Sequence, residues 1–132
     1  MAVSTITAVL DCDLQTVWEK VTSLKDSTWR SDLDHIDIID DLQFIEVSKD
    51  GYRTEFTTTV KEPCSRWEFD MDNDNMKGHW CGTFSFEDDK TIVIFTEDIT
   101  PKKMILKPFV KRFLKKQQET YVRDLKQELS RK

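Results

Sequence analysis

Two polar side chains interrupt apolar faces in this sequence, and they are the first candidates for chemistry. Glu97 lies on the apolar face of an alternating, strand-like segment. Gln117 lies between Phe113 and Tyr121 on a helical apolar stripe. A buried polar group without a partner costs roughly 1–3 kcal/mol, so each would need a hydrogen bond, a water or a ligand. We interpret both as groups that orient the polar end of a bound molecule, and exposure to solvent is the alternative for each.

Aromatic side chains are the second candidate feature. Eight Phe, four Trp and two Tyr accompany only three Gly and three Pro. Many of the aromatics fall on the apolar side of alternating segments, where they either line a pocket for an apolar ligand or fill the core of a small domain. With Glu97 and Gln117, the candidate ligand-binding residues are Phe56, Trp67, Trp80, Phe84, Phe95, Phe109 and Phe113.

Signals for covalent catalysis, phosphate binding or metal binding are thin. No Ser/His/Asp or Cys/His arrangement has a known local context, and the three glycines are isolated. His79 and Cys81 share one strand face, but no further metal ligands accompany them. The acidic segment 70–74 starts like a calcium loop and lacks the required Gly and Glu. We therefore expect no catalytic residue, metal site or cofactor, and the sequence leaves enzymatic activity open while favouring a non-enzyme.

Charge is unevenly distributed along the chain. The net charge is −5, yet residues 102–116 carry seven bases and no acid, which leaves −12 for the remainder. Bases near a helix N-terminus oppose the macrodipole, so helix energetics do not explain them. An anionic membrane, a ligand headgroup, an acidic protein or simple solvation would fit, and the net charge disfavours nucleic acid. The bases expected to make a transient contact are Lys107, Lys111, Arg112 and Lys115.

The length of 132 residues fits one domain, which we expect to span residues 1–132. No apolar run approaches the roughly 20 residues that span a bilayer. The N-terminus lacks the basic flank of a secretory signal. Three cysteines at unpatterned spacing favour a reducing, cytoplasmic location.

The elements that would position these residues follow from periodicity. A strand from Val3 to Leu10 precedes a helix capped by Asp13, and residues 27–33 predict a short second helix or a tight loop. Pro108 predicts a kink or a helix that begins near residue 108 and runs to about residue 129. Between them, short turns such as Asp50-Gly51 join further strands of an antiparallel meander, expected over residues 35–40, 42–48, 52–61, 66–72, 76–86 and 91–99.

This order of elements resembles the helix-grip fold of the START/Bet v 1-like (SRPBCC) superfamily, including its polyketide cyclase/dehydrase-like branch. The resemblance is carried by the opening strand into Val17-Trp18, by Trp29 followed by Asp32, and by the pattern Gly78-x-Trp80-x-Gly82-x-Phe84-x-Phe86. It implies an α+β fold in which a seven-stranded curved antiparallel sheet wraps around a long C-terminal helix. Two short helices after strand 1 and an apolar cavity between sheet and helix are also implied.

The resemblance and the aromatic faces together predict binding or transport of a small hydrophobic or amphipathic ligand, lipid- or polyketide-like, in that cavity. A second hypothesis is a cyclase or dehydratase acting on an aromatic polyketide-like substrate, with Glu97 or a cavity histidine as general acid or base. It is weakened because His35 and His79 fall outside the apolar registers. A third hypothesis is an interaction module that uses residues 102–116 against a membrane or an acidic protein. Because the loops are short, any cavity should be small.

Overall fold

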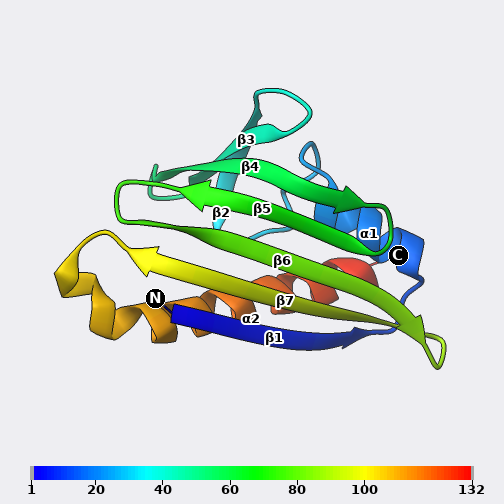
Figure 1. Ribbon diagram of the computed structural model, residues 1–132. Helices are drawn as coiled ribbons and strands as arrows, with labels where there is room; N and C mark the ends of the chain where they lie inside the picture. Colours follow the sequence, from blue (N-terminus) through cyan, green and yellow to red (C-terminus); the bar gives the residue numbers. More distant parts are fainter. Residues whose placement is uncertain (1, 132) are drawn as a thin grey trace.

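A curved sheet and one long helix organise the protein, whose computed structural model describes residues 2–131 (Figure 1). The strands and helices are, in chain order, β1 (Ala2–Leu10), α1 (Leu14–Thr22), β2 (Leu33–Ile38), β3 (Gln43–Ser48), β4 (Arg53–Glu62), β5 (Arg66–Asp72), β6 (Met76–Glu87), β7 (Lys90–Pro101), the 3-10 helix η1 (Met104–Phe109) and α2 (Val110–Ser130).

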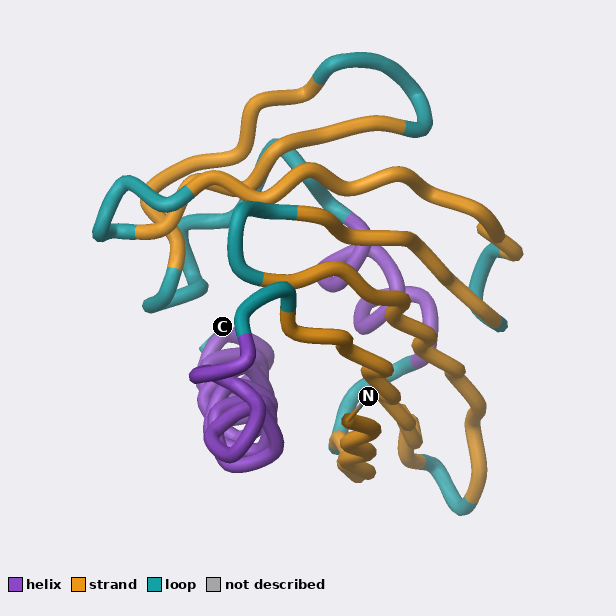
Figure 2. Tube along the Cα trace, turned by 60° about the vertical axis from the view of Figure 1, so that its left-hand side comes forward, coloured by secondary structure: helices purple, strands orange, loops and turns teal. Residues whose placement is uncertain are grey.

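The sheet is a seven-stranded antiparallel meander in which the first strand lies at one edge, beside the last strand. Its order is β1-β7-β6-β5-β4-β3-β2, so β2 to β7 pair in sequence. Strand β1 pairs with β7, with Ala2 opposite Ile99 and Leu10 opposite Thr91. Figure 2, in which α2 is seen nearly end-on, shows the strands arching over one side of this helix. The helix-grip architecture expected from the sequence is confirmed.

The region between β1 and β2 contains one helix rather than two. Helix α1 has the expected cap, since the Asp13 carboxylate accepts a hydrogen bond from the Thr16 backbone N–H at 3.0 Å. The second short helix is not formed, and residues 23–32 make turns that we call the α1–β2 loop. Local bonds compete with helix formation there, because the Trp29 indole donates to the Asp26 carbonyl and Ser31 donates to Asp124 of α2.

Helix α2 begins at Val110, directly after η1 with its internal Pro108. This agrees with a helix that begins near residue 108. Its buried face departs from the predicted apolar stripe at Phe109 and Phe113, which are 61% and 50% exposed. The buried side chains recur at intervals of three or four residues and are Val110, Leu114, Gln118, Val122 and Leu125, with Asp124 beside them.

Aromatic side chains of the sheet pack on one another in the core. Trp80 stacks on Phe69 at a ring-centroid distance of 4.7 Å, and Phe44 stacks on Phe56 at 4.9 Å. Phe84 instead contacts Trp18 of α1 at 4.9 Å. The sheet aromatics therefore fill much of the space under the arch. Among the helices of residues 2–131, none is both long and apolar enough to cross a membrane.

Candidate functional site

Two hollows lie between the sheet and α2. An inner cavity of about 100 Å³ is closed by the α1–β2 loop, with Trp67, Trp80 and Phe95 at its back. An outer groove of about 740 Å³ runs along η1 and the first turns of α2. The two hollows meet at a junction, whose shared wall residues are Asp32, Glu46, Phe56, Met71, Glu97 and Gln117.

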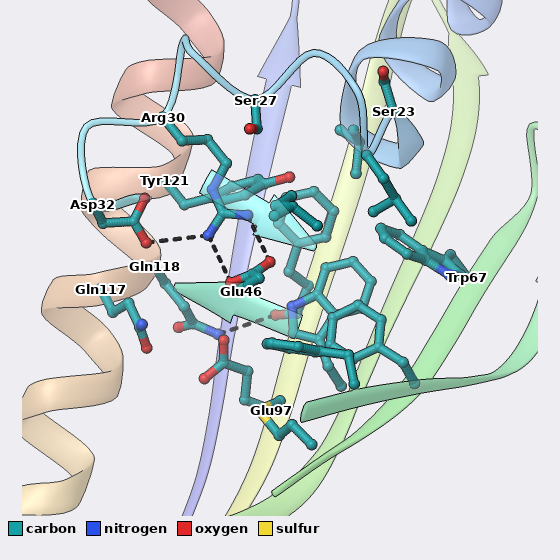
Figure 3. Close-up of a pocket in the computed structure, with 18 of the residues that line it drawn as sticks. Ser23, Ser27, Arg30, Asp32, Glu46, Trp67, Glu97, Gln117, Gln118 and Tyr121 are labelled. Atoms are coloured by element: carbon teal, nitrogen blue, oxygen red, sulfur yellow. Dashed lines mark hydrogen bonds and ion pairs between the residues drawn. The ribbon is translucent and has the colours of Figure 1, made fainter. Parts of the chain in front are cut away.

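Arg30 of the α1–β2 loop lies beside the inner cavity with its side chain 13% exposed, and it holds two carboxylates (Figure 3). Its guanidinium donates to both Glu46 oxygens, at 2.8 and 3.3 Å, and to Asp32 at 3.1 Å. It also lies 5.0 Å from the centre of the Tyr121 ring, in a cation–π contact. Burial alone would lower the pKa of Arg30, but Glu46 and Asp32 raise it above its usual range. Arg30 is therefore a fixed positive charge committed to these two acids.

Glu97 reaches the junction from the opposite side. Its side chain extends from β7 toward α2 (Figure 3), and no hydrogen bond or ion pair joins its carboxyl to another residue of the described chain. Burial raises the pKa of Glu97 to about 7, with the charge of Glu46 adding to the shift and that of Arg30 opposing it. This carboxyl can hold or release a proton near neutral pH.

The two glutamines of α2 have different surroundings. Gln117 lines the junction with an exposed side chain. Gln118 is buried, accepts from the Ser4 hydroxyl at 2.7 Å and donates to the Ser4 and Phe95 carbonyls at 2.9 and 3.4 Å. The buried amide that holds α2 to β1 and β7 is thus Gln118, whereas the predicted ligand-orienting residue Gln117 is exposed at the junction.

The structure brings most of the predicted ligand-binding residues to the two hollows. The inner cavity is lined by Phe56, Trp67, Trp80, Phe95, Glu97 and Gln117. Phe109 and Phe113 line the helical side of the outer groove. Phe84 lies in neither wall, because it packs against Trp18.

The lining residues that the sequence analysis missed include Arg30, Asp32, Glu46 and Tyr121. Glu46 had a usable signal, since it continues the face of buried Phe44 in β3 as Glu97 continues that of Phe95 in β7. Arg30 had none, because it lies in a loop without periodicity.

His79 and Cys81, which the sequence placed on one strand face, lie on the face of the sheet opposite to that of Trp80 and Phe84. The His79 ring nitrogens lie 2.7 Å from Glu68 and 2.7 Å from Asp70, and Arg66 donates to the Cys81 sulfur at 3.4 Å. Burial lowers the pKa of His79, but Asp70 and Glu68 outweigh it and raise the pKa overall. Within residues 2–131, no group of three or more His, Cys, Asp or Glu is placed to hold a metal ion.

Comparisons with known proteins identify the fold to which this architecture corresponds. No protein-family model matches the sequence, and no curated protein matches it. A START superfamily protein from Mycobacterium smegmatis superposes with a TM-score of 0.82 at 16% identity, over 96% of both chains. This protein has the START fold.

Two further structures agree on the START fold. A conserved protein from Geobacillus kaustophilus has a TM-score of 0.84 at 11% identity, over 98% of this chain and 95% of its own. DynU16, from the dynemicin biosynthetic locus, has a TM-score of 0.78 at 14% identity, and the match covers 98% of this chain but 47% of DynU16. At such identities the likeness concerns the fold alone.

The basic segment of this START fold forms an apolar tip beside the mouth of the outer groove. Met104 and Ile105 in η1 are 78% and 76% exposed. Lys102 pairs with Asp72 at 2.6 Å, while Leu106 and Lys116 line the groove itself. Apolar and basic side chains are therefore interleaved where the groove opens.

Proposed function

We propose that this protein binds and carries a small amphipathic molecule, with the apolar body in the outer groove and the polar end at the junction beside Glu97. The observation that carries this proposal is the outer groove. Its volume of about 740 Å³ falls within the 300–1,000 Å³ usual for small-molecule sites, whereas the inner cavity of about 100 Å³ does not.

The lining of the groove suits an apolar body. Ile99 and Leu114 form its floor, and the rings of Phe109 and Phe113 stand half-exposed at its edge. Clustered exposed apolar side chains commonly mark an interaction site. Ligand binding would remove this surface from water, at about 25 cal/mol for each Å² of apolar area buried.

The proposal shifts the ligand relative to the sequence-based expectation. The sheet aromatics were expected to hold the apolar body, but Trp67 and Trp80 pack on each other at 5.7 Å. In the proposed complex they form the back wall behind the junction. Phe109 and Phe113 contact the ligand from α2, and Gln117 stands where its amide can reach the polar end.

Decyl compounds provide the test, titrated below their micelle-forming concentrations and followed by calorimetry. We expect one ligand per chain. Phe113→Glu should weaken binding at least tenfold, because it places a carboxylate in the apolar groove. Phe86→Glu is the matched control, since Phe86 is also 50% exposed but lines neither hollow. Absence of binding, or equal loss in both variants, would contradict the proposal.

Contact with an anionic membrane is a second candidate activity, favoured by the exposure of Met104 and Ile105. Apolar side chains among lysines insert at the interface of anionic bilayers. Such docking would place the groove mouth at the membrane, where an amphipathic ligand could enter.

Sedimentation with phosphatidylserine-containing vesicles tests this docking. Binding should fall with salt and in Ile105→Asp, but not in Ile39→Asp, whose parent side chain is 55% exposed outside the basic segment. Equal binding to neutral phosphatidylcholine vesicles would contradict an electrostatic contribution.

Glu97 favours a third candidate, the cyclase or dehydratase. A general acid or base works best with a pKa near the working pH, and the pKa of Glu97 is about 7. Loss of water from a poly-β-ketone substrate, abolished in Glu97→Gln while binding persists, would support this activity.

A cytoplasmic setting is part of the proposal, and it is supported by three cysteines that form no disulfide.

A further inference from the structure

We infer that the ligand's polar end is cationic, an ammonium group that binds at the junction as the counter-ion of Glu97. This inference rests on the proposed function and names the chemical class of its ligand. It comes from the balance of charges around the junction, together with the hydrogen bonds that the wall residues make and lack.

Acids outnumber bases at the junction. Asp32, Glu46 and Glu97 face it, and the guanidinium beside them is that of Arg30. The hydrogen bonds of Arg30 go to Glu46 and Asp32, so Glu97 receives none of them. The second oxygen of Asp32, Oδ1, is also buried without a hydrogen-bond partner in residues 2–131. With all three acids ionised, the formal charge of this group is −2.

The other charged or titratable groups of the two walls do not cancel this charge. The charges of Lys49 and Asp50 in the groove wall offset one another. Helix α2 contributes Tyr121, whose pKa is raised by burial, so its hydroxyl stays neutral. It also contributes Lys116, which lines the groove but makes no ion pair with Glu97. The three acids therefore exceed the single guanidinium by two charges at the point where the inner cavity opens into the groove.

An ammonium supplies what the junction lacks. It carries one positive charge and three N–H donors, so it can pair with the Glu97 carboxylate and offset part of the charge of the acids around it. A carboxylate or phosphate end would meet the excess negative charge and be disfavoured. A hydroxyl end could donate one hydrogen bond but would leave the charge uncompensated.

The ammonium would compete with a proton for Glu97. An alkylamine, like a lysine, titrates near pH 10 and stays charged between pH 6 and 8. With a Glu97 pKa of about 7, the ionised fraction of Glu97 rises from about 0.1 at pH 6 to about 0.9 at pH 8. Affinity for an amine should therefore rise about tenfold over this interval.

Three probes of equal chain length test the inference: decylamine, decanol and decanoate. We would titrate each by calorimetry at pH 6 and pH 8. At pH 8, decylamine should bind at least tenfold more tightly than the other two. Glu97→Gln should remove both this preference and the pH effect. Glu119→Gln, which removes a carboxylate from the exposed side of α2, should keep both.

The outcomes separate the inference from the function on which it rests. If no probe binds, the proposed function fails and the inference fails with it. If decanol or decanoate binds as tightly as decylamine, the cationic end group is wrong while the carrier function stands. If decylamine is preferred equally by Glu97→Gln, Glu97 is not its partner. Decanol binding by Glu97→Gln would show that the variant keeps its groove.

Discussion

The carboxyl of Glu97 and the guanidinium of Arg30 line the same cavity, but their charges are compensated differently. Arg30 is held by Glu46 and Asp32, at distances of 2.8–3.3 Å. Removing Arg30 would leave both carboxylates without their cation, and breaking a buried ion pair in this way typically costs about 3–5 kcal/mol. Glu97 has no such cation, so in the empty protein protonation relieves the cost of its burial.

Replacement of Glu97 by glutamine should stabilise the empty protein at alkaline pH. The folded protein keeps a proton that the unfolded chain releases near pH 4.5, so the free energy of unfolding falls as pH rises from 4.5 through 7. The full loss, on the order of 3 kcal/mol, is present above pH 7. Urea unfolding at pH 4.5 and pH 8 should show Glu97→Gln gaining stability over the unmodified protein only at pH 8. An equal difference at both pH values would contradict the buried, unpartnered carboxyl.

Glu97 could be found from the sequence because side chains along a strand alternate between the two faces of the sheet. Polar residues on a helix are harder to place, since one position corresponds to 100° of rotation, and the buried amide proved to be Gln118 rather than Gln117. Arg30 could not be found, because its partners Asp32 and Glu46 come together only through tertiary structure.

Strand β6 shows how an element shapes the cavity wall. The Trp80 ring lies over Gly82 and stacks on Phe69 of β5 at 4.7 Å. A β-carbon at residue 82 would lie 2.8 Å from Cζ3 of Trp80 and 3.1 Å from Cδ1 of Phe95. The glycine thus lets the indole lie flat against the sheet, where it forms the back of the inner cavity.

A methyl group at residue 82 should displace this ring. Because Trp80 is packed between neighbouring aromatics, Gly82→Ala should cost about 1–3 kcal/mol and change the tryptophan emission. Ser85→Ala, at an exposed position of the same strand, should change stability by less than about 0.5 kcal/mol. Chemical unfolding followed by fluorescence measures both effects, and an unchanged Gly82→Ala would mean that Trp80 does not lie over the glycine.

The elements themselves were largely predictable because their local signals agree. Apolar composition and alternation together located all seven strands, and Asp13 and Pro108 marked where the helices begin. For residues 27–33 the local sequence left a short helix and a tight loop open, because the contact that holds the loop joins Ser31 to Asp124, 93 residues later in the chain. Such a contact leaves no mark in the local sequence.

At the scale of the whole molecule, the START fold divides its interior unequally. Aromatic packing under the sheet reduces the inner cavity to about 100 Å³, while the groove beside η1 keeps about 740 Å³. Of the basic residues in the segment 102–116, Lys116 lines the groove, while the unpaired acid lies at the junction with the inner cavity. This polarity orients an amphipathic cation with its charge inward and its apolar end toward the tip.

Nuclear Overhauser effects between decylamine and the methyl-labelled protein test the central claim most directly. The account predicts contacts from the terminal methyl of the ligand to Leu106 in η1, and from the carbon next to nitrogen to Met71 at the junction. Contacts confined to the exposed tip residues Met104 and Ile105, or no intermolecular contacts in a saturated sample, would contradict it.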